Sequence, residues 1–382
     1  MKTYLLISPQ PWGKMFLSKH NYAIELADQG HKVYFVNPPV YKKDIAISIQ
    51  VRQEMANLYL VEYTLSVPLH ILRFKIRFLY DFIIKKFLVS KLNALAEFDE
   101  IWCFEPNIFS NFKMFKAKKK LLFLVDQHDN TTLKKLSNEA DGIATISSMI
   151  LDYFSFSNKP KLLLNHGLNR TFTRLAEERL QSGLFYKKGA SVKVAYVGNL
   201  LQGNRMDYKT IQLIIEQNND ITFHIYGPYE EKGNTLGSTT NQDLQAFINF
   251  LKNNQQVYLH GILSQEDLAN QIQDMDAFLT CYNYLTDDNR SSNCHKIIEY
   301  LSTGKVAISN RILTYEKTTG LLEMPLEYTN ENLPSLFKKV IAGLDQFNTP
   351  EKQKIRIDFA LANTYINHTK TINHFLENLS PQ

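Results

Sequence analysis

Residues 287–310 place a lysine and a glutamate one helical turn apart, behind a polar loop. The apolar spacing after the loop predicts a helix that Gly304 ends, followed by a short buried strand over residues 306–308. A loop that leads into a helix N-terminus offers free backbone N–H groups to an anion. Lys296 could add a charge for a phosphate, and Glu299 could accept two ribose hydroxyls. The alternative for this pair is an ordinary solvated interaction on a helix face.

The same stretch resembles the nucleotide-binding segment of GT-B glycosyltransferases of the broad family 4 group, which reads Asn-Pro-x-Lys-x-x-Glu-Tyr-Leu-x-x-Gly-Lys-Pro-Val. The matching positions are Asn293, Lys296, Glu299, Tyr300, Leu301, Gly304, Lys305 and Val306. Cys294 replaces the first proline, and the second proline is absent. Ser291 stands where many members of the group carry another glutamate. Residues 195–228 resemble the teichuronic-acid and xanthan type of transferase, and residues 257–282 match the strand, glycine and helix that come before the donor loop.

This resemblance implies an α/β protein with the GT-B fold, in which two Rossmann-like domains face each other across a cleft. Two series of strands and helices separated by a polar stretch agree with that organisation. The expected divisions are an acceptor-binding domain over 1–169, a linker over 170–191, a nucleotide-sugar-binding domain over 192–350, and a long helix over 351–382 that crosses back to the first domain.

Residues near this segment extend the expected nucleotide site. Gly198 follows the predicted strand 192–197 and would let the backbone approach a phosphate. Arg205 could supply a second charge, or it is an ordinary surface residue. Tyr282 could stack on a base or pack in the core. The expected donor-binding residues are Gly198, Asn199, Arg205, Tyr282, Ser292, Asn293, His295, Lys296 and Glu299. The resemblance implies a site without a metal ion or cofactor, with a UDP-sugar favoured over a GDP-sugar.

A cluster of titratable residues follows the predicted strand 121–125. An inverting transferase needs a base for the acceptor hydroxyl, and Asp126, His128 and Asp129 are the candidates at this strand end. We expect Asp129 to be the base, although it could instead cap the helix that starts near residue 131. Trp12, in the loop after the first strand, could stack on an acceptor sugar or pack on its own loop.

Basic and large apolar residues alternate at helical spacing between residues 65 and 98. One interpretation is a helix packed on the sheet with a solvated basic edge. The other is a helix lying on an anionic membrane surface through residues 65–90, with its arginines and lysines on the polar face.

Composition sets the limits of these interpretations. The chain has 382 residues, 44% of them hydrophobic, which suits two globular domains. A net charge of +5 is too small for a nucleic-acid-binding protein but suits anionic substrates or an anionic membrane surface. The three cysteines have no metal-ligand spacing, which indicates a reducing compartment, so we expect a cytoplasmic protein at or near the inner face of the membrane. The first apolar run, 4–7, is too short for a signal-peptide core, and no transmembrane helix is expected.

Two functions follow from these patterns. The first is a glycosyltransferase that moves a sugar from a nucleoside diphosphate to a saccharide or lipid-linked saccharide acceptor, in the synthesis of a surface polysaccharide. The second is a protein of the same shape that uses the nucleotide site differently, as an inactive sugar-nucleotide-binding subunit, an epimerase or a phosphorylase. Retention of both Lys296 and Glu299 favours the first.

Overall fold

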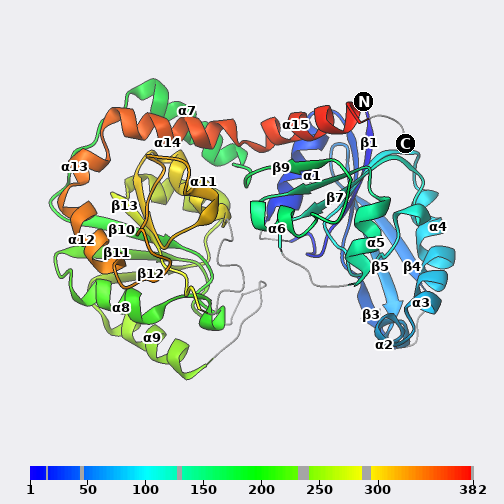
Figure 1. Ribbon diagram of the computed structural model, residues 1–382, viewed down its shortest axis with the longest axis horizontal. Helices are drawn as coiled ribbons and strands as arrows, with labels where there is room; N and C mark the ends of the chain where they lie inside the picture. Colours follow the sequence, from blue (N-terminus) through cyan, green and yellow to red (C-terminus); the bar gives the residue numbers. More distant parts are fainter. Residues whose placement is uncertain (14–15, 44–46, 127–130, 231–240, 286–293, 380–382) are drawn as a thin grey trace. The chain divides into compact units, whose positions relative to one another are not determined.

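The computed structural model describes residues 1–13, 16–43, 47–126, 131–230, 241–285 and 294–379. The chain divides into two compact units, which are Met1–Asn165 with Tyr365–Gln382, and His166–Thr364. Each unit contains a parallel sheet and its own hydrophobic core. Helices accompany both sheets (Figure 1), so the α/β class and the presence of two Rossmann-like units are as expected.

The sheet of the first unit has nine strands, in the order β3-β5-β2-β1-β6-β7-β8-β9, with β4 paired to β5. The strands are β1 (Thr3–Ile7), β2 (Lys32–Val36), β3 (Val40–Lys42), β4 (Ser48–Met55), β5 (Leu58–Ser66), β6 (Phe98–Cys103), β7 (Ala117–Leu124), β8 (Gly142–Thr145) and β9 (Lys161–Leu163). All pairs are parallel except β4 with β5. The buried apolar runs 4–7 in β1, 33–36 in β2 and 101–103 in β6 suit the centre of the sheet, where both faces are covered.

The helices of the first unit are α1 (Ser18–Asp28), α2 (Val67–Lys75), α3 (Arg77–Ile84), α4 (Ser90–Asn93), α5 (Thr131–Glu139), α6 (Ser148–Asp152) and α15 (Tyr365–Glu377), with a π-helical turn over Lys85–Val89 and a 3-10 turn over Phe112–Met114. α15 packs on α1. The contact is polar as well as apolar, since the hydroxyl of Tyr22 lies 3.1 Å from Nδ1 of His368.

The sheet of the second unit has six parallel strands in the order β12-β11-β10-β13-β14-β15. The strands are β10 (Val192–Val197), β11 (Ile221–Tyr226), β12 (Val257–Gly261), β13 (Ala277–Thr280), β14 (Val306–Ser309) and β15 (Leu322–Glu323). The helices are α7 (Arg170–Ser182), α8 (Tyr208–Glu216), α9 (Gln242–Asn253), α10 (Gln265–Gln271), α11 (His295–Ser302), α12 (Leu333–Ala342), α13 (Leu344–Phe347) and α14 (Pro350–Ala362), with 3-10 turns over Gly203–Arg205, Ile272–Asp274 and Leu313–Tyr315. α7, α11 and α14 cover one face, and α8, α9 and α12 the other (Figure 1).

Two expected elements differ from the structure. The stretch expected as a linker begins with α7, because Phe172 and Ala176 lie one turn apart and are buried, Phe172 in the second core. The expected single helix over 351–382 is two helices, α14 and α15. Between them the carbonyl of Asn363 accepts the N–H of Leu168 at 2.7 Å, so the backbone at this point pairs with another segment instead of continuing the helix.

Residues 65–98 also depart from the simpler expectation of one helix packed on the sheet. The first two residues of the range, 65 and 66, end β5, and α2, α3, a π-helical turn and α4 follow in place of one helix. No residue of α2 is buried, and only Tyr80 and Ile84 of α3 are. Both helices therefore present most of their apolar residues to solvent. In the part of the chain that the structure describes, no helix is long and apolar enough to cross a membrane.

Candidate functional site

The strand order of the second unit reverses between β10 and β13. The chain builds β11 and β12 on one side of β10, then continues with β13, β14 and β15 on the other side. In open parallel sheets a ligand commonly binds at such a reversal, outside the carboxyl ends of the two strands. Here β10 ends at Val197 and β13 ends at Thr280. The loops that begin at Gly198 and Cys281 therefore border the expected ligand position.

Glycines keep the ends of β10 and β11 close together. The N–H of Gly198 donates to the carbonyl of Tyr226 at 2.7 Å. A β-carbon on Gly227 would overlap the carbonyl oxygen of Gly198, and one on Gly198 would overlap the side chain of Lys296. Since neither position has room for a side chain, the backbone itself forms this edge of the sheet.

Lys296 lies in the first turn of α11 and is buried. Its ammonium donates to the hydroxyls of Tyr196 and Tyr282, at 3.2 Å in each case. It also lies 4.8 Å and 5.7 Å from the centres of those two rings, a cation–π arrangement. Among the described residues no carboxylate forms an ion pair with it. The buried positive charge is thus held by neutral groups and is available to an anion.

Glu299 follows one turn later on α11 and is partly buried. Burial raises the pKa of its carboxyl group to about 8, although the charge of Lys296 acts in the opposite direction. The carboxyl group makes no hydrogen bond within the described residues, so its oxygens remain available to hydroxyl donors. The expected solvated surface pair does not describe Lys296 and Glu299, because the lysine is buried and bonds to tyrosines.

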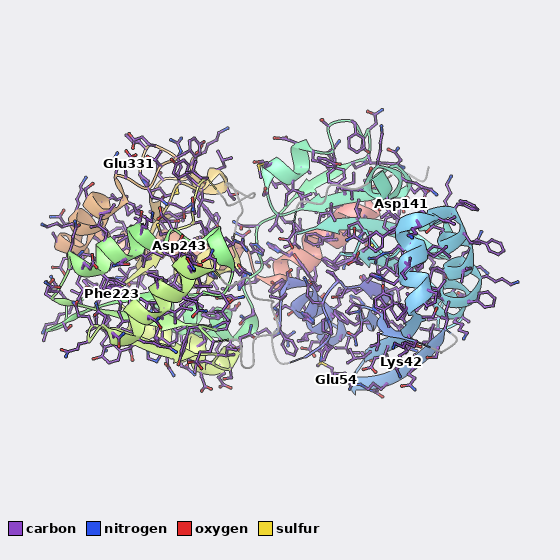
Figure 2. All side chains as sticks on the ribbon, turned by 90° about the horizontal axis from the view of Figure 1, so that it is seen from below. Lys42, Glu54, Asp141, Phe223, Asp243 and Glu331 are labelled. Carbon is purple, nitrogen blue, oxygen red and sulfur yellow. The ribbon has the colours of Figure 1, made fainter. Side chains whose placement is uncertain are left out.

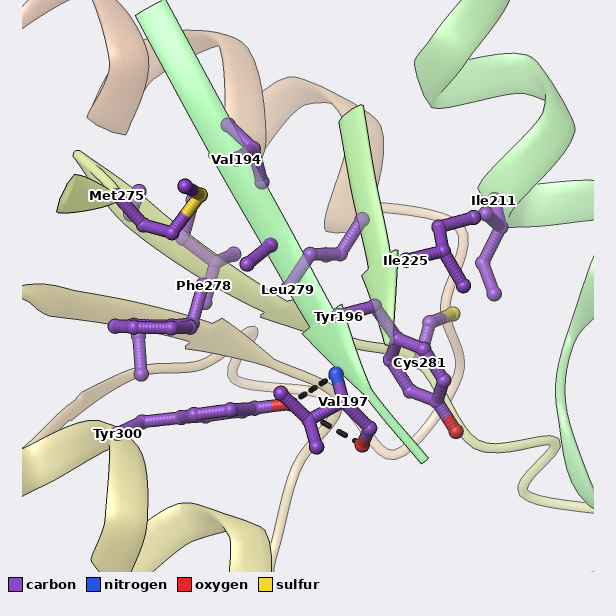
Figure 3. Close-up of a cluster of buried hydrophobic side chains, with 14 of the residues drawn as sticks. Val194, Tyr196, Val197, Ile211, Ile225, Met275, Phe278, Leu279, Cys281 and Tyr300 are labelled. Carbon is purple, nitrogen blue, oxygen red and sulfur yellow. Dashed lines mark hydrogen bonds between the residues drawn. The ribbon is translucent and has the colours of Figure 1, made fainter. Parts of the chain in front are cut away.

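Tyr300 fixes α11 against the end of β10. Its hydroxyl accepts the N–H of Val197 at 2.8 Å and donates to the carbonyl of the same residue at 3.4 Å (Figure 3). Its ring stacks on Phe278 of β13 with centres 4.2 Å apart. The resemblance matched Tyr300 without giving it a role. In the structure it joins the helix of Lys296 to both strands at the reversal.

Tyr282 is buried, so the core-packing alternative describes it better than a free stacking surface. Its N–H donates to Asn310 at 3.0 Å, and its carbonyl accepts from Asn330 at 2.8 Å. The guanidinium of Arg205 lies 5.2 Å from the centre of the Tyr282 ring. The Tyr282 ring therefore lies close to two cations, Lys296 and Arg205.

Two of the four remaining expected donor residues, Asn199 and His295, are among the described residues. Asn199 is buried, and its side-chain oxygen accepts the N–H of Leu201 at 2.9 Å, which shapes the loop after β10. His295 is exposed at the start of α11, with its ring centre 5.9 Å from that of buried His166. Ser292 and Asn293 lie outside the described residues. Neither Tyr196 nor His166 was predicted from the sequence as a site residue.

In the first unit, Trp12 packs among aromatic rings, with centres 5.1 Å from Phe16 and 5.0 Å from Phe35. Its indole N–H donates to Glu54 at 3.1 Å, and Glu54 is labelled on this unit in Figure 2. These contacts favour the alternative in which Trp12 packs against neighbouring residues over the one in which it stacks on a sugar. Asp126 is exposed just after β7. His128 and Asp129 lie outside the described residues.

No group of three or more histidine, cysteine, aspartate or glutamate side chains is placed to hold a metal ion, within the ranges described above. The described part of the second unit places a buried lysine, an arginine and a glutamate of raised pKa beside the backbone edge at Gly198.

No protein-family model matches the chain, and no curated protein matches its sequence. Solved structures match its fold. The α,α-trehalose-phosphate synthase (UDP-forming) of Burkholderia xenovorans, in complex with glucose-6-phosphate, has a TM-score of 0.70 at 10% identity, over 99% of this chain and 100% of that one. The sucrose-phosphate synthase of Thermosynechococcus elongatus has a TM-score of 0.67 at 13% identity, over 100% of both chains.

A trehalose-6-phosphate synthase studied for glycosyltransfer with retention has a TM-score of 0.68 at 11% identity, over 99% of this chain and 100% of that one. The TM-scores show a common fold, and at identities this low they show the fold alone. The fold is the GT-B fold that the resemblance in residues 293–306 implied.

Proposed function

We propose that this protein is a glycosyltransferase that takes its sugar from a nucleoside diphosphate. The observation that supports this most directly is the ammonium of Lys296, buried between Tyr196 and Tyr282 without a carboxylate partner among the described residues. A buried charge with no counter-ion is costly unless a ligand of opposite charge completes the site. The diphosphate of a nucleotide sugar is such a ligand, and the site lies where a parallel sheet commonly binds one.

The charge of each side chain determines the role that we propose for it in binding the nucleotide sugar. As the glycosidic bond breaks, negative charge develops on the departing diphosphate, and Lys296 with the N-terminal N–H groups of α11 would stabilise it. Arg205 would add a second positive charge. Glu299, one turn further along, would accept the ribose hydroxyls. The backbone at Gly198 would pass close to the phosphates, because no side chain stands there.

A UDP-sugar is the favoured donor, and the UDP-forming synthase with the same fold supports this choice. The acceptor in this proposal is a saccharide or lipid-linked saccharide used in a surface polysaccharide, as in the teichuronic-acid and xanthan type of transferase that the sequence resembles. Asp126, His128 and Asp129 remain the candidates for a catalytic base in an inverting reaction. The trehalose-6-phosphate synthase with the same fold was studied for glycosyltransfer with retention. A reaction that retains the anomeric configuration would need no such base.

Calorimetry with UDP and with GDP tests the donor site directly. A charged hydrogen bond lost from a partly desolvated site weakens binding by about 1.5–3 kcal/mol, so Lys296→Ala should reduce UDP affinity roughly tenfold or more. Lys338→Ala, on the exposed side of α12, is the matched control and should bind normally. Unchanged affinity in a folded Lys296→Ala variant refutes the assignment. Turnover of a panel of UDP-sugars then separates a transferase from an inactive binding subunit.

The second part of the proposal is attachment to an anionic membrane through α2 and α3. Large apolar side chains on these helices and the following turn are strongly exposed, namely Ile71 (50%), Phe74 (70%), Phe78 (79%), Phe82 (61%) and Phe87 (46%). Exposed lysines accompany them at positions 75, 85 and 86. Exposed aromatic residues that could enter a lipid interface, beside lysines that would attract anionic headgroups, support this part of the proposal.

One basic residue expected to contribute does not belong to this surface. Arg77 is only partly exposed and forms an ion pair with Asp81 at 2.9 Å. It also donates to the carbonyls of Asn107 and Ile108, at 2.9 Å and 3.1 Å. Its guanidinium therefore holds α3 to the loop after β6.

Flotation with phosphatidylcholine vesicles, with and without phosphatidylglycerol, tests the attachment. We expect salt-sensitive binding to the anionic vesicles only, because each exposed lysine contributes about 1 kcal/mol near such a surface. A variant with Phe74, Phe78 and Phe82 changed to serine should lose binding. Phe185→Ser is the control, since Phe185 is equally exposed on the second unit. Equal recovery of the triple variant and the wild type with the vesicles contradicts the proposal.

A further inference from the structure

The first sheet has its own reversal of strand order, between β1 and β6. From β1 the chain adds β2 on one side, and only later returns to add β6, β7, β8 and β9 on the other. The carboxyl ends of the two central strands are followed by Ser8 and by Phe104. By the rule that applies to the second sheet, a ligand of the first unit belongs at this edge.

A buried lysine lies at this edge. Lys19 is in the first turn of α1, the helix that follows β1, and its side chain is 4% exposed. Its ammonium makes no hydrogen bond or ion pair within the described residues. A lysine this deeply buried usually has a partner, because an unpaired charge in the protein interior is costly.

Two carboxylates act on Lys19 without forming an ion pair with it. Burial lowers the pKa of Lys19 to about 8, while the charges of Asp126 and Glu105 act to raise it. Glu105 follows β6, is 9% exposed, and accepts the N–H of Asn107 at 2.6 Å through one oxygen. Asp126 follows β7, next to β6 in the sheet. One cation and two carboxylates thus converge from three neighbouring elements, separated by more than hydrogen-bond distance.

We propose that Lys19, Glu105 and Asp126 bind hydroxyl groups of an uncharged sugar, the acceptor of the transferase proposed above. An ammonium only donates hydrogen bonds, and an ionised carboxylate only accepts them. A sugar hydroxyl does both, so it can bridge groups that do not reach each other. A phosphate or carboxylate on the ligand would face two negative charges against one positive charge and is disfavoured here.

This inference rests on the proposed function and makes it more specific. The synthase of the same fold was solved in complex with glucose-6-phosphate, an anionic sugar. The charge balance around Lys19 indicates that the sugar unit bound at this position in the present protein carries no phosphate.

NMR titration tests the site with four probes, which are the methyl glycosides of glucose, galactose and mannose, and glucose 6-phosphate, each with the protein saturated in UDP. We expect at least one glycoside to bind more tightly than glucose 6-phosphate. Its affinity should fall roughly tenfold in both Lys19→Met and Glu105→Gln, because each removes a hydrogen bond to a charged group. Lys113→Met, at an exposed lysine of the same unit, should bind as the wild type does.

Three results would overturn the inference. The first is that no neutral glycoside binds. The second is that glycoside binding is the same in both variants as in the wild type. The third is that glucose 6-phosphate binds more tightly and depends on Lys19. Calorimetry with UDP alone keeps the two proposals apart, since Lys19→Met should leave UDP affinity unchanged and Lys296→Ala should not. Glu105→Gln is nearly isosteric, so glycoside binding by this variant still tests the inference if Lys19→Met folds poorly.

Discussion

The backbone of Gly198 and the ammonium of Lys296 occupy adjoining space at the end of β10, where a β-carbon on residue 198 would overlap Nζ of Lys296. Tyr196 contacts the same ammonium through its hydroxyl at 3.2 Å. One strand end therefore both leaves room for the lysine and supplies a hydrogen-bond acceptor for it. The position of the buried charge depends on the absence of a side chain at residue 198.

Gly198→Ala should displace Lys296 and lower the affinity for UDP roughly tenfold, a loss comparable to that of a hydrogen bond to a charged group. Calorimetry measures the effect. Gly189→Ala is the matched control, because the segment after α7 has room for a β-carbon at that position. Normal UDP binding in a folded Gly198→Ala variant would show that the close approach has no role in nucleotide binding.

Glu299 should make the stability of the protein depend on pH. Its folded pKa is raised from 4.5 to about 8 by burial, so the folded state holds a proton between these values that the unfolded state has lost. The free energy of unfolding contributed by this group therefore falls as the pH rises from 4.5 to 8. Glu299→Gln removes the titration. Denaturant unfolding at pH 5 and pH 8 should show a smaller difference in the variant than in the wild type, and an equal difference would contradict the assignment.

Lys19→Met should stabilise the protein at pH 7 while it weakens sugar binding. The folded pKa of Lys19 is lowered from 10.5 to about 8 by burial, so its contribution to stability is unfavourable below pH 8 and improves as the pH rises from 8 to 10.5. Methionine fills similar space without the charge. Thermal unfolding at pH 7 should give a higher midpoint for the variant. A lower midpoint at pH 7 would indicate that the lysine has a stabilising partner.

Asp129→Asn distinguishes a catalytic base from a helix cap, because asparagine caps a helix but cannot accept the proton. NMR of the product anomer comes first. If the configuration inverts, we expect the variant to lose turnover and keep its melting temperature and UDP affinity. Near-normal turnover would exclude Asp129 and leave Asp126 and His128. A retained configuration removes the requirement for a base at all three positions.

Much of the fold could be predicted because its strands are short, buried and apolar. β10 has the limits that were predicted for the strand 192–197, and Gly304 follows α11 with a positive φ of 75°, as expected of the residue that ends this helix. β4 was not predicted, because its alternating polar residues face solvent on an edge strand and give no buried run. The break between α14 and α15 was also missed, since it depends on pairing with the distant residue Leu168.

The chemical site was predictable only in part. Lys296 and Glu299 stand out in the sequence because they fall in a motif with fixed spacing. Tyr196 does not, because a tyrosine near the end of a buried strand usually packs in the core. Lys19 has the sequence context of an ordinary helix lysine. Its burial, and the effect of the charges of Glu105 and Asp126 on it, arise only in the folded first unit.

The membership of α15 in the first unit sets an order of events during protein synthesis. α15 covers α1 and places Phe375 against Gly142, and its Glu377 pairs with Lys2 at 2.7 Å. The ribosome makes α15 only after all of the second unit. A nascent chain that has completed residues 1–165 therefore still exposes the surface of Tyr22 that later meets Tyr365. The first unit is the first to be translated and the last to be completed, so the second unit can reach its final structure before the first does.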